Sequence, residues 1–156
     1  MWRSVHIETD GYSGSGVVIS TGLVLTCFHC IHTNSKMAVD KKEAEIIGVD
    51  PEHDLCLLSV KTLDTPQIIL GVPTLGEMVL SACCPLGMED VLLFGRTCSV
   101  KKERIVHDMH GCPGVSGSAL FNMEGELLGI NHSMMGNKHV GGWLTVAVPS
   151  MSLQKI

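Results

Sequence analysis

The sequence is poor in aromatic residues, poor in charge and without a long apolar run. Aromatic side chains make up 4% of the 156 residues and charged side chains 17%, whereas 45% of the residues are hydrophobic. This balance excludes a disordered chain. No apolar run approaches the roughly 20 residues of a membrane-spanning helix, and the first residues lack the apolar core of a secretion signal. We therefore expect one compact domain that does not contact a membrane.

Basic charge is also scarce. The formal net charge is −5 with neutral histidines, and the dense basic run is Lys-Lys-Glu-Arg at residues 101–104. Binding to nucleic acid depends on clustered Lys and Arg side chains that neutralise phosphates. The composition therefore predicts no nucleic-acid partner, and it favours a solvated turn or strand end for residues 101–104.

The cysteines do not divide evenly into pairs. Seven are present, so at least one thiol stays free in a monomer. Together with the missing secretion signal, this predicts a reducing, intracellular setting, which is the cytoplasm, or the host-cell cytoplasm if the protein is viral or from a phage. The oligomeric state is left open by the sequence.

Glycine is plentiful and divides the chain into short apolar segments. The 17 glycines separate runs rich in Val, Ile and Leu, which are typical of strands, and only residues 150–156 suggest a helical turn. We predict an all-β fold of two antiparallel six-stranded β-barrels with a short C-terminal helical turn. The single domain would span residues 1–156, as an N-terminal barrel (1–62), a connector (63–76), a C-terminal barrel (77–150) and a tail (151–156). The predicted strands are residues 3–7, 16–20, 23–26, 36–39, 43–49 and 55–60, followed by 77–82, 91–101, 104–106, 118–122, 127–132 and 142–148.

One serine lies in a glycine-flanked loop that suits nucleophilic chemistry. Ser116 follows Cys-Pro-Gly-Val at residues 112–115 and precedes Gly117 and an apolar strand. Glycine permits positive φ angles and close approach of a substrate, and such a loop can aim successive N–H groups at a developing oxyanion. A surface turn would give the same short pattern, so this motif alone is a weak signal.

A serine nucleophile needs a base, and the base needs a group that orients it. Among the eight histidines, His29 follows the apolar strand at residues 23–26, where a side chain lies at the rim of a sheet. Asp54 begins the apolar run at residues 55–60, and a carboxylate there is costly to bury without a partner. The candidate catalytic residues are therefore His29, Asp54 and Ser116.

Five segments, taken together, resemble the trypsin-like serine proteases of the HtrA type. They are residues 14–31, which begin Gly-Ser-Gly-Val-Val, residues 54–60, Pro-Leu-Gly at 85–87, the loop and hairpin at 113–131, and Val-Ala-Val-Pro at 146–149. They occur in the family's order across roughly residues 12–150. The resemblance implies a chymotrypsin-like fold, and because no PDZ-like segment follows in this sequence, we expect a protease domain without PDZ.

The resemblance also implies roles for these residues. Ser116 would attack the peptide carbonyl, His29 would accept its proton, and Asp54 would orient the imidazole. The N–H groups of Gly114 and Ser116 would form the oxyanion hole. The expected function is a serine endopeptidase that cleaves polypeptides through an acyl-enzyme, without a cofactor. The alternative is a catalytically silent binding or scaffold module, because a fold does not guarantee activity.

Two positions in the serine loop depart from the family pattern. Val115 stands where relatives usually carry a polar residue, and Ser118 stands where many have a second glycine. Neither change removes a catalytic atom, so we expect altered packing of the loop and an intact site.

The cysteines near the site suggest two other kinds of chemistry. Cys30 and Cys112 occupy positions of disulfide halves in secreted relatives, but the expected partner regions, near residues 14 and 137, contain no cysteine. Both thiols are therefore predicted to be free. Cys-Phe-His-Cys-Ile-His at residues 27–32 is similar to half of a zinc site, but no second C-x-x-C with suitable spacing exists. We therefore predict no metal site.

Three further residues are candidates for substrate binding: His110, Asn131 and His132. By the resemblance, the specificity pocket is formed by residues 107–112 and 131–135. His110 lies where trypsin-like digestive enzymes carry an aspartate, so a preference for Lys or Arg is not expected. The sequence predicts weak selectivity for uncharged or acidic residues at the cleavage site. Side chains that merely satisfy backbone groups would fit the same positions.

Overall fold

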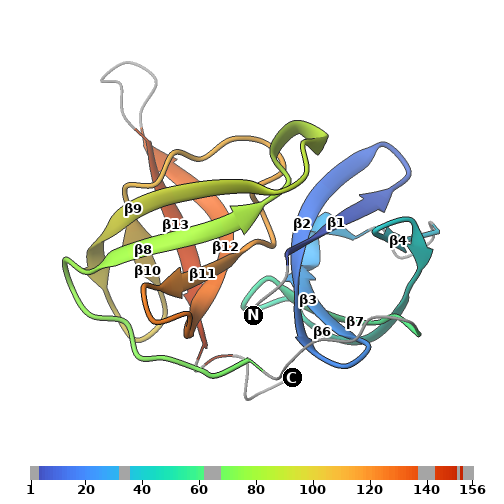
Figure 1. Ribbon diagram of the computed structural model, residues 1–156, viewed down its shortest axis with the longest axis horizontal. Coiled ribbons are helices and arrows are strands. Elements are labelled where there is room, and N and C mark those ends of the chain that lie inside the picture. Colours follow the sequence, from blue (N-terminus) through green and yellow to red (C-terminus); the bar gives the residue numbers. More distant parts are fainter. Residues whose placement is uncertain (1–3, 32–35, 62–67, 137–142, 151, 153–156) are drawn as a thin grey trace.

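The regular secondary structure consists almost entirely of antiparallel strands, arranged in two lobes (Figure 1). The computed structural model describes residues 4–31, 36–61, 68–136, 143–150 and 152. Two short 3₁₀ turns interrupt the strands, η1 (Phe28–Cys30) and η2 (Pro85–Gly87). The strands are β1 (Ser4–Thr9), β2 (Tyr12–Ser20), β3 (Leu23–Cys27), β4 (Ala38–Val39), β5 (Lys42–Glu43), β6 (Glu45–Asp50), β7 (Leu55–Ser59), β8 (Met78–Cys83), β9 (Val91–Val100), β10 (Ile105–His107), β11 (Ala119–Asn122), β12 (Leu127–Gly136) and β13 (Trp143–Pro149).

The N-terminal lobe is a curled sheet in the order β5-β4-β1-β2-β3-β7-β6. Its first hairpin joins Thr9 to Tyr12 through Asp10 and Gly11, and Gly11 has a φ of 78°. An Asp-Gly pair suits this tight turn because glycine adopts positive φ without steric cost. Along β1 the side chains of residues 5 and 7 are buried while their neighbours are partly exposed, which is the alternation that fixes the register of a half-buried strand.

The C-terminal lobe is a closed barrel in the order β10-β13-β12-β11-β8-β9, and β9 pairs with β10 to complete it. The predicted all-β, two-lobed chymotrypsin-like fold is confirmed. The first lobe differs from the predicted six-stranded barrel, because its described strands form a curled sheet and not a closed barrel. It has seven strands because residues 42–43 pair with β4 as a separate short strand. The predicted connector (63–76) falls between β7 and β8, and its residues 63–67 lie outside the described residues. Most of the predicted helical turn at 151–156 also lies outside them. Neither described helix is long enough to span a membrane.

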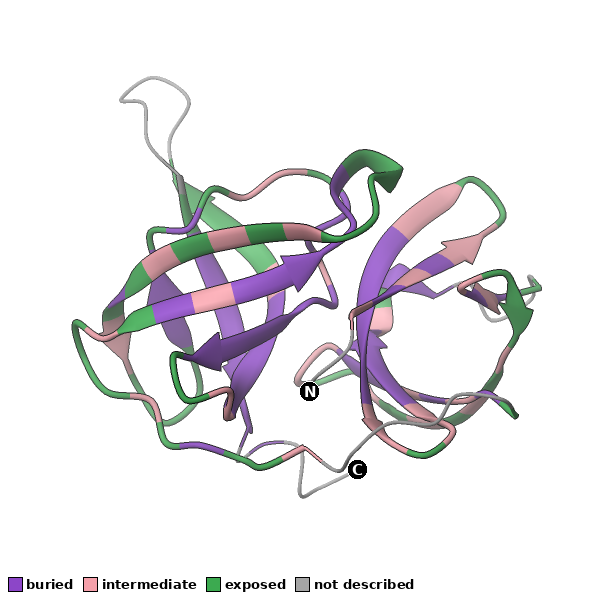
Figure 2. Ribbon diagram, viewed as in Figure 1, coloured by how far each residue is buried: buried purple, intermediate pink, exposed green. Residues whose placement is uncertain are grey.

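An apolar cluster joins the two lobes, and Figure 2 shows that strands of both lobes carry buried stretches. The cluster includes Cys30 and Leu55, which adjoin His29 and Asp54 in the sequence. Because close-packed interiors resist small displacements, this cluster holds the two lobes in a fixed relation. Its fully buried members are Val17, Leu25, Cys27, Cys30 and Leu55 from the first lobe and Ala119, Phe121, Leu127, Ile130 and Val148 from the second.

Candidate active site

His29 and Asp54 meet at the end of the β3–β7 ladder. The ladder pairs Cys27 with Leu55, so η1 follows β3 at the point where Asp54 precedes β7. The main-chain N–H of Phe28 donates to the Asp54 carbonyl at 3.0 Å. Residues 25 positions apart in the sequence are therefore held together by the regular pairing of two strands.

The Asp54 carboxylate binds His29 twice. Oδ1 accepts the main-chain N–H of His29 at 2.8 Å, and Oδ2 lies 2.5 Å from the ring Nδ1. Asp54 has a φ of 56°, a left-handed conformation that aspartate tolerates better than most residues. Burial alone would raise the pKa of Asp54, but the hydrogen bonds from His29 hold it below its usual range. The same carboxylate is the largest cause that raises the pKa of His29, followed by the Cys30 sulfur. The paired ring is thus a stronger base than a free imidazole.

Ser116 lies in a loop that glycines allow to bend sharply. Gly114 has a φ of 96° and Gly117 a φ of 86°. Ser15, on β2 of the other lobe, fastens this loop. Its main-chain N–H donates to the Ser116 carbonyl at 3.0 Å, and its hydroxyl donates to the Gly114 carbonyl at 2.6 Å. The Ser15 hydroxyl also accepts the N–H of Cys84 at 2.8 Å, so one buried side chain links β2, the serine loop and the start of η2. Sequence reasoning missed Ser15, although it lies within the Gly-Ser-Gly motif.

The peptide between Pro113 and Gly114 has a fixed orientation. The Pro113 carbonyl accepts the N–H of Leu86 at 2.9 Å. In a trans peptide the C=O and N–H point in opposite directions, and the described residues contain no cis peptide. The Gly114 N–H therefore points away from Leu86. Within the described residues, neither Gly114 nor Ser116 donates a main-chain hydrogen bond to another backbone group, so both N–H groups are available to an oxyanion.

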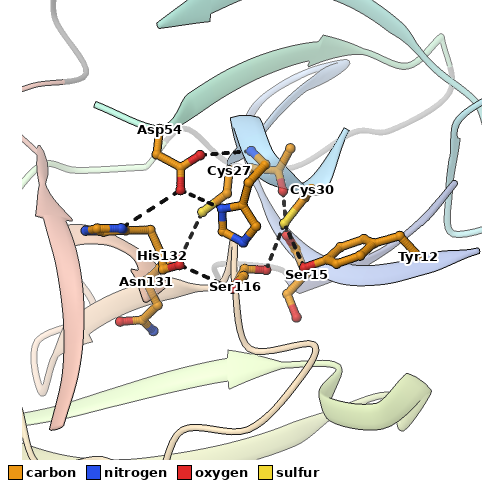
Figure 3. Close-up of polar contacts among 10 residues, drawn as sticks. Tyr12, Ser15, Cys27, Cys30, Asp54, Ser116, Asn131 and His132 are labelled. Carbon is orange, nitrogen blue, oxygen red and sulfur yellow. Dashed lines mark hydrogen bonds and ion pairs between the residues drawn. The ribbon is translucent and has the colours of Figure 1, made fainter. Parts of the chain in front are cut away.

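The Ser116 hydroxyl lies at the junction of the two lobes (Figure 3). It donates to the carbonyl of His132 at 3.4 Å, and its resting contact is therefore with β12 rather than with His29. The ring of His132 also reaches the site from β12, with Nδ1 3.9 Å from Oδ2 of Asp54. Burial is the main cause that lowers the pKa of His132, so its ring approaches the carboxylate in the neutral form.

A pocket of about 380 Å³ opens beside Ser116. Of the three predicted substrate-binding residues, Asn131 and His132 line it, whereas His110 is exposed and lies outside its lining. Gly111 forms part of the wall, where an added Cβ would come within 2.5 Å of the Met134 sulfur. The remaining lining residues include Tyr12, Ser13, Leu86, Cys112, Ser133, Met134 and Thr145.

Asn131 is the centre of a buried polar network under the serine loop. Its carbonyl accepts the N–H of Gly117 at 2.8 Å and the thiol of Cys27 at 3.1 Å. Its side chain contacts Nε2 of His107 at 2.7 Å and donates to Ser118 Oγ at 3.0 Å. Because buried amides are costly unless satisfied, this network orients the loop. Ser118, which departs from the family pattern, thus supplies an oxygen that the network uses.

His107 makes the stability of this network dependent on pH. Burial lowers the pKa of His107, and this effect outweighs the hydrogen bond with Asn131 and the charge of Asp108, which both raise it. The ring Nδ1 of His107 is buried without a hydrogen-bond partner. The unfolded chain binds the proton near pH 6.5, so in acid the unfolded state takes up more protons and stability is lost as the pH falls below about 6.5. We expect the urea midpoint to fall more steeply from about pH 7 to about pH 5 in the wild type than in His107→Gln. Equal slopes would contradict this assignment.

Cys30 and Cys112 are free thiols, as predicted. A Cβ added to Gly14 would lie 3.2 Å from the Cys30 sulfur, so the expected partner position is adjacent but holds a glycine. Hydrogen bonding from Cys27, with further contributions from His29 and Tyr12, lowers the pKa of the Cys30 thiol to about 5 despite its burial. The Tyr12 hydroxyl lies 3.4 Å from the Cys30 sulfur. The rings of Tyr12 and His29 meet edge-on, with their centroids 6.4 Å apart.

Comparison with known sequences identifies similar proteins. Residues 14–130 match the family described as the trypsin-like peptidase domain. A curated protein of Pseudomonas fulva, named a probable periplasmic serine endoprotease DegP-like, is 34% identical over 87% of this chain and 32% of its own length. A Chlamydia muridarum protein with the same name is 25% identical over 96% of this chain and 34% of its own length. The chain thus spans about a third of the length of these relatives.

Solved structures give the same picture. A serine endoprotease from Yersinia pestis superposes with a TM-score of 0.86 at 26% identity, over 98% of this chain and 60% of that one. A Mycobacterium tuberculosis protease in an inactive form also superposes with a TM-score of 0.86, at 19% identity, over 97% of this chain and 83% of that one. At this low identity, the similarity to the Mycobacterium tuberculosis protease shows a shared fold and nothing more.

The prediction of an intracellular, cytoplasmic setting is wrong, because the curated relatives at 33–34% identity are named periplasmic. The odd number of cysteines did not indicate the cellular compartment correctly. Five of the seven are buried, and Cys98 alone is exposed. A packed core shields a buried thiol from oxidants in solution, so the number of cysteines does not report the compartment.

Proposed function

Because the chain belongs to the trypsin-like peptidase domain family, we propose that it is a serine endopeptidase with Ser116 as nucleophile, His29 as base and Asp54 as the group that orients the base. The observation that carries the proposal is the double hydrogen bond between Asp54 and His29, at 2.8 and 2.5 Å, beside the glycine-flanked loop of Ser116. The substrate would be a polypeptide, as the relatives' names suggest.

The first step needs the Ser116 hydroxyl to turn toward His29. It rests 3.4 Å from the His132 carbonyl, a long contact that a rotation about χ1 would have to exchange for one with His29. Nδ1 of His29 is occupied by Asp54, which leaves Nε2 to accept the serine proton as Oγ bonds to the peptide carbonyl carbon. The imidazolium that forms is stabilised by Asp54 and later gives its proton to the leaving amine. Water then releases the acyl group by the same route.

The charge that develops on the substrate oxygen would be stabilised by Gly114 and Ser116. Their N–H groups make no backbone hydrogen bond within the described part of the chain, and the Leu86–Pro113 bond holds the first of them in place before substrate arrives. Such pre-oriented donors avoid the cost of reorganisation during the reaction. The adjacent pocket of about 380 Å³, with Met134 and Thr145 in its wall, would receive the side chain before the cleaved bond.

A fluorophosphonate probe tests the proposal, because it phosphonylates only an activated serine. We expect labelling at Ser116, and its loss in both Ser116→Ala and His29→Ala. A folded protein that stays unlabelled would instead be the silent binding module.

Ser13 provides a matched control for this experiment. It lines the same pocket as Ser116 and its hydroxyl contacts Nε2 of His6 at 2.5 Å. Gly11 and Gly14 flank it at the same spacing as the glycines around Ser116, but it lies in strand β2 and not in a loop. Labelling should therefore be unchanged in Ser13→Ala. Mass-spectrometric mapping of the probe to Ser13 would overturn the assignment of the nucleophile.

A further inference from the structure

Three soft-metal donors converge on one point at the end of β3. The sulfurs of Cys27 and Cys30 and a ring nitrogen of His29 all lie within 4.8 Å of one another. They converge because η1 is a 3₁₀ turn, which has about three residues per turn and so brings residues i and i+3 to the same side. The sequence prediction of no metal site assumed that a second C-x-x-C was needed, whereas here His29 supplies the third donor.

The surroundings suit a metal-bound histidine. Asp54 holds Nδ1 of His29 at 2.5 Å, which leaves Nε2 as the ligand atom. A carboxylate on the other ring nitrogen is the usual support of a metal-bound histidine, because it fixes the tautomer and raises the basicity of the ring. The interaction that would orient a general base would therefore also prepare a metal ligand.

The two sulfurs can be released from their present contacts at little cost. Cys27 donates its thiol to the Asn131 carbonyl at 3.1 Å, and the Cys30 sulfur lies 3.7 Å from the Ser116 carbonyl oxygen. Thiol hydrogen bonds are weak. A thiol releases its proton to solvent when its sulfur binds the metal, and the two thiolates neutralise a divalent cation. Both sulfurs are buried, whereas the His29 side chain is 42% exposed and gives access from solvent.

We propose that Cys27, His29 and Cys30 bind a zinc ion, and that the bound ion inhibits the peptidase by occupying His29. Two thiolates and an imidazole favour zinc over calcium or magnesium, and the fourth tetrahedral position is left for water. A nitrogen that binds zinc cannot accept the serine proton. The inhibitory consequence rests on the proposed function, but the binding itself does not.

Cobalt serves as the spectroscopic probe for binding. One equivalent of Co²⁺, added to reduced, metal-free protein, should produce sulfur-to-cobalt charge-transfer absorption and tetrahedral d–d bands, and Zn²⁺ should abolish both by displacement. In Cys27→Ser and Cys30→Ser the affinity should fall at least about 100-fold, since even outer-shell changes cost 10–100-fold. Cys98→Ser, which alters the exposed thiol, is the control and should bind as the wild type does.

Alkylation provides a test that needs no variant. In an incubation long enough for transient opening to expose Cys27 and Cys30 to iodoacetamide in the metal-free protein, bound Zn²⁺ should protect both thiols and leave Cys98 reactive, as mapped by mass spectrometry. In the peptidase assay, Zn²⁺ should inhibit the wild type and EDTA should restore its rate. A protein without charge-transfer absorption and without protection overturns the zinc site even if it is an active peptidase. Conversely, binding by an inactive protein would retain the site and refute the proposed function.

Discussion

In the Asp54→Asn variant, kcat is expected to fall about 10⁴-fold with little change in the fold. An asparagine tolerates the left-handed conformation at this position, and its carbonyl can still accept the His29 main-chain N–H that now lies 2.8 Å from Oδ1. Its amide group, however, would face Nδ1 as a donor. The ring must then carry its proton on Nε2, so the nitrogen that faces the serine can no longer accept one. Steady-state kinetics on a peptide substrate, with circular dichroism to check the fold, measures the effect.

Asp50 offers a matched control for this prediction. It binds His53 as Asp54 binds His29, through the main-chain N–H at 3.2 Å and Nδ1 at 2.7 Å. In Asp50→Asn a comparable aspartate–histidine pair is altered outside the site, so kcat should stay within about twofold of the wild type. A loss below tenfold in Asp54→Asn, or an equal loss in both variants, would refute the assigned role of Asp54.

The sequence was sufficient to identify the His29–Asp54 pair as a hypothesis because both residues lie at strand ends. An apolar run ends before His29, and another begins after Asp54, so each is marked by local hydrophobicity. The pairing of Cys27 with Leu55 brings the two residues together. Which strand pairs with which cannot be deduced from the alternation of apolar and polar residues alone. The family resemblance supplied that pairing.

Asn131 and His132 show why the predicted substrate contacts were harder to resolve. The register between β12 and β13 shifts between Asn131 and Ser133, and a bulge breaks the alternation from which side-chain direction is inferred. Asn131 is consequently 1% exposed and bonded to His107, while the His132 ring approaches Asp54. Nothing in the local sequence marks the bulge.

Long-range contacts were likewise beyond the sequence. The Ser15 hydroxyl bonds to Gly114 and to Cys84, which lie 99 and 69 positions away. A serine between two glycines in a strand indicates close approach of another backbone, but the pattern does not say which one. The connection exists only because the apolar cluster between the lobes brings β2 against the serine loop.

The second large effect is expected in Gly117→Ala, which should lose more than about 4 kcal/mol of unfolding free energy. A Cβ at this position would lie 2.0 Å from the Ser15 carbonyl oxygen and 2.4 Å from Thr26 Oγ1. The first of these is a backbone atom of a central strand, so the clash can be relieved only by separating the serine loop from the other lobe. That movement would also break the bond from the Gly117 N–H to the Asn131 carbonyl, now 2.8 Å long.

Gly76→Ala separates this clash from the cost of backbone conformation. Gly76 has a similar φ, 80° against 86°, but an added Cβ there would meet no atom within 4 Å. Its alanine variant should lose only about 1–2 kcal/mol, the cost of a left-handed conformation for a residue with a Cβ. Urea unfolding of both variants gives the comparison, and the excess loss in Gly117→Ala measures how tightly the serine loop is held against β2. Equal losses would mean that the loop can move away from β2 freely, and the fixed placement of Ser116 would then have no physical basis.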